Sequence, residues 1–212
     1  MALKAAIIPV TPFQQNCVLI WEEASREATV IDPGGDVETI LGAIASEGLT
    51  LTQILLTHGH IDHAGGADEL REKTGVAVIG PQIGDKILLD NLERQGSAYG
   101  IAGSRNLVPD RWLEEGGSVT LGGEEFSILH CPGHSPGSLV YVSEKLRIAF
   151  VGDVLFQGSI GRTDFPYGDH PALIDAIMTK LLPLGDDIAF VCGHGPGSDF
   201  GTERRSNPFL NE

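Results

Sequence analysis

The feature that most constrains this chain is a short, ligand-rich segment at residues 57–63, with the sequence THGHIDH. It follows an apolar run that is typical of a buried strand. Imidazole and carboxylate groups are ligands that suit zinc, iron or manganese. His58 and His60 alternate as they would at the end of a strand, whereas Asp62 and His63 stand where a helix is expected to begin. The loop is therefore expected to direct two pairs of ligands from two directions, as two neighbouring metal ions require.

Three further ligand-type residues follow strand-like segments and have small residues beside them. They are His134 in HCPGH, Asp153 in FVGD and His194 in VCGH. Strand ends flanked by glycine leave room for a metal ion and a substrate at one edge of a sheet. We therefore predict that these three residues join the loop in binding metal. By contrast, His130 and His170 lack this context, and we interpret them as a packed histidine and a helix-start residue.

The hydrophobic pattern of the whole chain predicts an α/β fold. Strands are indicated at residues 3–10, 16–21, 27–32, 52–56, 76–79, 119–121, 125–129, 138–143 and 147–151, with a last strand at 187–192. Helical spacing is found at residues 37–44, from 62 to about 74, and from 170 to about 182. These two sets of elements, without a linker between them, predict one domain over residues 1–212, a four-layer αββα sandwich of two mixed β-sheets flanked by helices.

One region has no clear pattern, residues 81–117, which combine an amphipathic stretch with an irregular segment. We interpret it as a connecting insert, with a functional flap as the alternative. The single-domain prediction does not depend on which of these is correct.

Charge and cysteine content narrow the possible partners and location. The formal net charge of −15 argues against binding nucleic acid and against a basic helix at a membrane surface. The three cysteines are far apart and form no Cys-x-x-Cys motif, which is typical of buried thiols in a reducing compartment. Cys131 is accordingly interpreted as a buried thiol and not as a ligand. With neither a signal peptide nor a spanning helix evident, we expect a cytoplasmic protein.

Taken together, the ligand series resembles that of the metallo-β-lactamase superfamily over essentially the whole chain. The αββα sandwich of that family agrees with the strand pattern. The resemblance implies two metal ions: one held by His58, His60 and His134, the other by Asp62, His63 and His194, with Asp153 as the bridge. The β-lactamases with a thiolate ligand place a cysteine in the second set, so this chain more closely resembles the hydroxyacylglutathione hydrolases (glyoxalase II).

A narrower resemblance is to the short, single-domain bacterial type of glyoxalase II, carried by residues 152–166 (GDVLFQGSIGRTDFP) and 203–210 (ERRSNPFL). The two-domain enzymes add a helical C-terminal domain that helps to bind glutathione, and the 18 residues after His194 cannot form it. The two-domain enzymes also place Lys and Tyr where this chain has Arg162 and Asp164. Arg162 is either a contact for a substrate carboxylate or a solvated arginine. Asp32, which also follows a strand, is either a hydrogen-bond acceptor for a ligand imidazole or a turn residue.

The resemblance implies a metal-dependent hydrolase that cleaves a small, glutathione-linked thioester such as S-lactoylglutathione by means of a metal-bridging hydroxide. Asp62 is expected to hold and orient the hydroxide. The cofactors implied are two divalent metal ions, zinc foremost and iron or manganese as alternatives. The competing interpretation is a sulfur dioxygenase acting on glutathione persulfide, in which a single iron is held by the equivalents of His58, His134 and Asp153.

Overall fold

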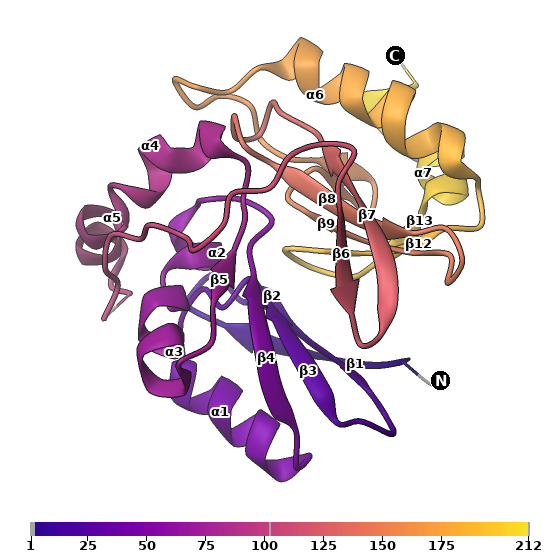
Figure 1. The fold of residues 1–212 in the computed structure, drawn as a ribbon. Coiled ribbons are helices and arrows are strands. Elements are labelled where there is room, and N and C mark those ends of the chain that lie inside the picture. Colours follow the sequence, from indigo (N-terminus) through magenta and orange to yellow (C-terminus); the bar gives the residue numbers. More distant parts are fainter. Residues whose placement is uncertain (1–2, 102, 212) are drawn as a thin grey trace.

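The computed structural model describes residues 3–101 and 103–211. In this part of the chain, two large mixed β-sheets pack face to face and helices cover their outer faces (Figure 1). The first sheet has the order β1-β2-β3-β4-β5, with antiparallel pairing up to β3 and parallel pairing from β3 to β5. Its strands are β1 (Leu3–Val10), β2 (Gln15–Glu22), β3 (Glu27–Ile31), β4 (Thr50–Leu55) and β5 (Val78–Ile79). Helices α1 (Val37–Ser46) and α3 (Ala67–Thr74) cover it.

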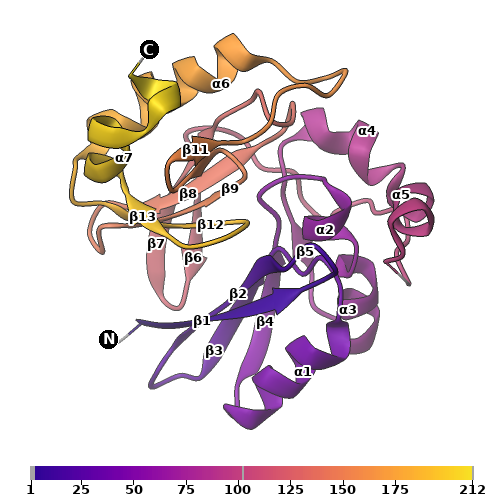
Figure 2. The same ribbon diagram turned by 180° about the vertical axis from the view of Figure 1, so that it is seen from behind.

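The second sheet has the order β13-β12-β9-β8-β7-β6, in which β12 and β9 are parallel and the other neighbours antiparallel. Figure 2 shows α6 (His170–Ala176) and α7 (Phe200–Ser206) over its outer face. The strands are β6 (Ser118–Leu121), β7 (Glu124–His130), β8 (Leu139–Ser143), β9 (Ile148–Gly152), β12 (Ala189–Cys192) and β13 (Ser198–Asp199). The four-layer sandwich predicted from the sequence is thus confirmed, whereas its extent as one domain over residues 1–212 stays a prediction.

Buried apolar side chains account for the four layers. Among the described residues they form three clusters, one between the two sheets and one between each sheet and its helices. Strand β2 shows how the sequence produces this: Val18 and Ile20 belong to the cluster between the sheets, while Cys17 and Leu19 belong to the cluster under the helices. Side chains alternate between the two faces of a strand, so an apolar strand buried on both faces serves two clusters at once.

Several expected elements differ in the structure. The helix expected from residue 62 to about 74 is interrupted, because α2 (Ile61–Ala64) ends at Gly65 and the Gly66 N–H donates to the carbonyl of Pro33 at 2.9 Å. The strand at residues 187–192 is not the last one, since β13 and α7 follow it. A small hairpin of β10 (Leu155–Phe156) and β11 (Ser159–Ile160) was not predicted.

The region at residues 81–117 contains more structure than its sequence indicated. It begins with a 3₁₀ turn (Ile83–Asp85), followed by α4 (Lys86–Leu89) and α5 (Leu92–Tyr99). Leu89, Leu92 and Ile101 bury their side chains in the cluster under the first sheet. These contacts hold α4 and α5 beside the edge at which β4 ends (Figure 1). None of the helices within residues 3–101 and 103–211 is long and apolar enough to cross a membrane.

Candidate metal centre

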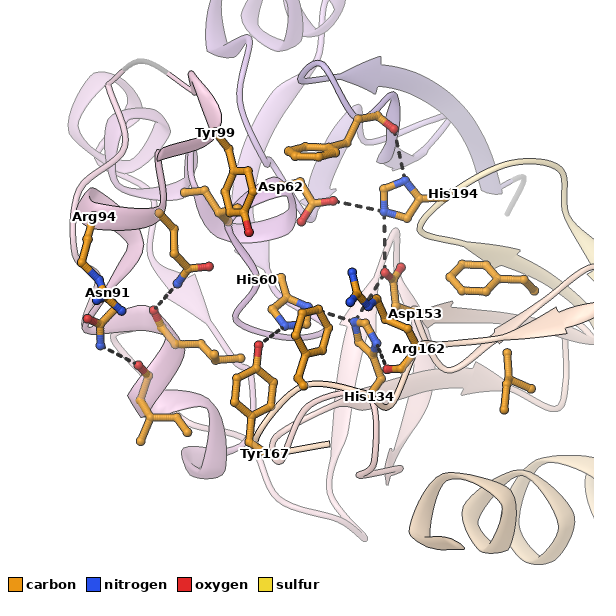
Figure 3. Close-up of a pocket in the computed structure, with 18 of the residues that line it drawn as sticks. His60, Asp62, Asn91, Arg94, Tyr99, His134, Asp153, Arg162, Tyr167 and His194 are labelled. Atoms are coloured by element: carbon orange, nitrogen blue, oxygen red, sulfur yellow. Dashed lines mark hydrogen bonds and ion pairs between the residues drawn. The ribbon is translucent and has the colours of Figure 1, made fainter. Parts of the chain in front are cut away.

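The predicted ligands converge from four separate parts of the chain (Figure 3). They follow β4, β7, β9 and β12, so strands from both sheets end at the same edge of the sandwich. The first group is His58, His60 and His134. The Nδ1 atom of His60 lies 3.0 Å from Nε2 of His58 and 2.9 Å from Nε2 of His134. Three ring nitrogens therefore face one point, and all three side chains are buried.

The second group is Asp62, His63 and His194. The Oδ2 atom of Asp62 lies 3.1 Å from Nε2 of His194 and 4.0 Å from Nε2 of His63. Asp62 and His63 lie on the single turn of α2, and the ring of His63 packs against that of His58 with their centroids 4.0 Å apart. The two groups are therefore adjacent, and metal binding by the residues of each stays a prediction.

Asp153 stands between the two groups. Its Oδ1 atom is 3.3 Å from Nε2 of His63, and its Oδ2 atom is 3.5 Å from Nε2 of His134 and 3.6 Å from Nε2 of His194. Its neighbours thus include members of both groups. The geometry places this carboxylate where a bridge would lie.

The donor set fits metal ions. Burial lowers the pKa of His58 well below its ordinary value, and it lowers the pKa of His60 to about 3, so both rings are neutral at physiological pH. Lone pairs of neutral rings that face one another repel, and a cation bound between the rings removes this repulsion. Two buried atoms, Nε2 of His63 and Oδ1 of Asp153, lie 3.3 Å apart, yet they form no hydrogen bond with each other or with any other described residue. Buried polar atoms of this kind need a partner, and metal coordination supplies one.

The outward nitrogen of each buried ring is held in place. Nδ1 of His58 lies 3.1 Å from the hydroxyl of Thr57, Nε2 of His60 lies 2.8 Å from the Tyr167 hydroxyl, and Nδ1 of His134 lies 2.9 Å from the Arg162 carbonyl. Such contacts fix the tautomer and orient the other nitrogen towards a metal ion.

Asp32 gives the same support to His63, whose Nδ1 donates to Oδ2 of Asp32 at 2.9 Å. The same carboxylate accepts from the Thr57 N–H at 2.7 Å and from the Thr57 hydroxyl at 2.6 Å. Of the two interpretations of Asp32, the structure supports the acceptor for a ligand imidazole.

Two ionised carboxylates give the site a preference for protons or metal cations. Burial opposes ionisation of Asp62 and Asp153, yet the surrounding histidines hold the pKa of both carboxyl groups below the ordinary value. Burial likewise opposes a charge on His63, but Asp153 and Asp62 raise its pKa well above the ordinary value. Protons and metal ions therefore compete for the same positions.

One supporting residue could not be recognised from the sequence, the buried Asp85 in the irregular region. Its Oδ2 accepts from the Gly59 N–H at 2.7 Å and from the Ser135 hydroxyl at 2.8 Å, and its Oδ1 accepts from the Gly137 N–H at 2.6 Å. Gly59 lies between two ligands and Ser135 follows a third, so one carboxylate joins both ligand loops. Burial raises the pKa of Asp85 to about 6 despite these donors, which leaves it ionised above neutral pH.

We expect Asp85→Asn to lower the free energy of unfolding by about 2–4 kcal/mol, because an amide has one acceptor oxygen and its NH₂ would face a buried donor. Metal affinity should fall about 10- to 100-fold, as for other residues that orient ligands. Thermal unfolding and metal titration at pH 7.5 check both effects. Asp90→Asn, which removes an exposed ion pair with Lys86, is the control and should change little. Unchanged stability and metal affinity in Asp85→Asn would contradict the assignment.

A cavity of about 750 Å³ opens over the ligands. His60, Asp62, His134, Asp153 and His194 line one part of it, and residues of α4 and α5 line another. The region at residues 81–117 is therefore more than a connecting insert, because it supplies a wall of the cavity.

Arg162 also lines the cavity, with its guanidinium held by Asp164 at 2.7 and 2.8 Å and lying 4.3 Å above the ring of Phe165. Its predicted contact with substrate stays a prediction.

The residues that the sequence analysis excluded as metal ligands lie outside the two ligand groups. His130 bonds through Nε2 with the Pro136 carbonyl at 2.8 Å, and His170 is the exposed first residue of α6. Cys131 is buried and free, and burial raises its pKa to about 12, so it is a neutral thiol.

The fold and the site define the class of protein. The sequence model of the metallo-β-lactamase superfamily matches residues 10–194, and the chain belongs to this superfamily. It is an enzyme of the metallo-hydrolase type, and its His and Asp clusters imply that it binds divalent metal. Among curated relatives, it is 50% identical over 210 residues to the hydroxyacylglutathione hydrolase GloC of Haemophilus influenzae, with 99% of each chain covered.

Solved structures of metallo-β-lactamase-fold proteins also match this chain. The B3 metallo-β-lactamase BLEG-1 matches with a TM-score of 0.89 and 38% identity, covering 99% of this chain and 100% of that one. TTHA1623 in a di-iron-bound form matches with a TM-score of 0.86 and 37% identity, covering 97% of this chain and 100% of that one. ETHE1 from Myxococcus xanthus matches with a TM-score of 0.77 and 28% identity, covering 100% of this chain and 86% of that one.

Proposed function

We propose that this protein hydrolyses thioesters of glutathione, such as S-lactoylglutathione, with two divalent metal ions as cofactors. The observation that carries the proposal is the position of Asp153, whose carboxylate lies within 3.6 Å of histidines from both ligand groups. A shared carboxylate of this kind suits a pair of ions. The likeness to the GloC hydrolase over nearly the full length of both chains supports the choice of substrate class.

The first ion would be held by His58, His60 and His134, the second by Asp62, His63 and His194, and Asp153 would be shared. When bound, divalent ions lower the pKa of a coordinated water to about 7 and polarise a carbonyl oxygen. The di-iron form of TTHA1623 supports iron as an alternative to zinc.

The chain's own groups position the reactants. Asp62 is ionised and lines the cavity, and the carboxylate oxygen that is not directed at His63 and His194 would hold the attacking water and orient its lone pair towards the thioester carbon. Tyr167 accepts from the Nε2–H of His60, which leaves its own O–H to donate into the cavity. The leaving thiolate needs no strong acid, since the pKa of a thiol is about 8.5.

The competing activity is oxidation of glutathione persulfide at a single iron. The likeness to ETHE1 leaves it open. The hydrolase is the better supported of the two, because the GloC hydrolase is 50% identical to this chain and ETHE1 is 28% identical.

The test is to assay the purified, metal-loaded protein with S-lactoylglutathione, and in parallel to measure oxygen uptake with glutathione persulfide. We expect thioester hydrolysis that a chelator abolishes and added zinc, iron or manganese restores, with no oxygen uptake. Elemental analysis should give close to two ions per chain. Oxygen consumption by a protein with one iron, without hydrolysis, would replace the hydrolase with the dioxygenase.

A further inference from the structure

The cavity has a second wall that the metal centre does not use. It is formed by α4 and α5, and Figure 3 shows Asn91 and Arg94 at the opposite end of the cavity from Asp153 and His194. Gln95 and Tyr99 lie four residues apart on one face of α5 with Arg94 beside them, and Asn91 is the N-cap residue that precedes the helix. All four side chains line the cavity.

Arg94 is the available cation of this cavity. Its side chain is exposed, and no described carboxylate lies within ion-pair distance of it. The other lining arginine, Arg162, already has its charge neutralised by two hydrogen bonds to Asp164. A guanidinium with free donors favours an anionic ligand group at this end of the cavity, although the chain as a whole has a net charge of −15.

The neighbouring amides offer the complementary acceptors. The NH₂ of Asn91 donates to the Ile87 carbonyl at 2.9 Å, and the NH₂ of Gln95 donates to the Leu88 carbonyl at 3.4 Å. These bonds orient both amides, and no donor among the described residues reaches either amide oxygen. One helical face therefore presents donors for a carboxylate and acceptors for an ammonium group.

We propose that this face of α5 binds the α-amino-acid end of the γ-glutamyl group of glutathione, with Arg94 on its carboxylate and the oxygens of Asn91 and Gln95 at its ammonium. This inference rests on the proposed function and extends it. The cysteinyl sulfur would lie at the metal centre and the γ-glutamyl end at the opposite wall, which Figure 3 shows at the other end of the cavity. Phe13 and Tyr99, whose rings meet edge to face at 5.7 Å, close the cavity beside this path.

The glutathione contacts would come from α5 and its N-cap and not from the described C-terminal segment. The described C-terminal segment after His194 forms β13, α7 and a 3₁₀ turn (Pro208–Leu210), and none of these lines the cavity.

The test compares Arg94→Gln with the wild type on S-lactoylglutathione and on the uncharged S-lactoyl thioester of N-acetylcysteamine. For the glutathione thioester we expect KM to rise about 10-fold with kcat within about twofold, the pattern of a lost binding contact. For the uncharged thioester KM should not change. Arg94→Lys keeps the charge and should recover part of the loss. Arg105→Gln, which removes an exposed ion pair with Glu72 in the same region, is the control and should behave as the wild type.

Calorimetry with S-hexylglutathione, which cannot be hydrolysed, tests the subsite apart from catalysis. We expect Arg94→Gln to weaken binding about 10-fold, and a glycyl ethyl ester of the same ligand to bind the wild type normally. Wild-type KM and Kd in Arg94→Gln, or no binding of S-hexylglutathione to the wild type, would overturn the subsite. If the wild type hydrolyses neither thioester but binds S-hexylglutathione through Arg94, the proposed function fails and the subsite stands.

Discussion

Asp153→Asn is expected to reduce thioester hydrolysis by at least about 10³-fold, or about 4 kcal/mol of transition-state stabilisation, and to lower the metal content. Asp153 lies within 3.6 Å of His63, His134 and His194, and these histidines hold its pKa well below the ordinary value. Asparagine has nearly the same shape but carries no charge. It also presents an NH₂ group where a metal ion needs an acceptor, so both ligand groups should bind more weakly.

Metal content by elemental analysis and kcat/KM for S-lactoylglutathione measure this effect. Circular dichroism shows whether the variant is folded. Asp187→Asn, which removes a carboxylate paired with Arg147 at the surface, is the matched control and should retain activity and metal. An Asp153→Asn protein that stays active with a full complement of metal would exclude Asp153 as the bridge.

The sequence made the fold and the ligand series predictable because both depend on local patterns. An apolar strand ending in glycine and a polar residue places that residue at a sheet edge, as with Asp153 after β9 and His194 after β12. The alternation of buried residues in β2 and the spacing of Val37, Ile40 and Ile44 in α1 likewise identify strand and helix directly.

Other features were not predictable because they depend on contacts between distant residues. Asp85 is an ordinary acidic residue in its own segment, and only the folded chain brings it to Gly59 and to Gly137, 26 and 52 positions away. The position of α5 at the cavity wall could not be predicted for the same reason. The sequence of a short helix of mixed composition does not indicate which surface the helix contacts. Short strands such as β13 also cannot be predicted, because a strand of two residues is too short to show an alternating hydrophobic pattern.

Gly193→Ala should lower kcat/KM by at least about 10²-fold, because displacing catalytic groups by about 1 Å has effects of this size. A Cβ atom at Gly193 would lie 2.1 Å from Oδ1 of Asp153 and 2.5 Å from Cε1 of His63. The glycine cannot move aside, since its N–H donates to Gly152 and its carbonyl accepts from Asn16, both at 2.8 Å. The collision must therefore displace the ligands.

Gly195→Ala separates this collision from simple backbone strain. Gly195 has a φ of +71°, but a Cβ atom there would meet nothing within 4 Å. We expect this variant to lose about 1 kcal/mol of stability from the left-handed backbone while keeping its metal. Gly193→Ala should show the opposite pattern: its metal affinity, measured by titration, should fall more than its thermal stability. Equal metal affinity in the two variants would mean that the close approach of Gly193 to Asp153 and His63 does not shape the metal centre.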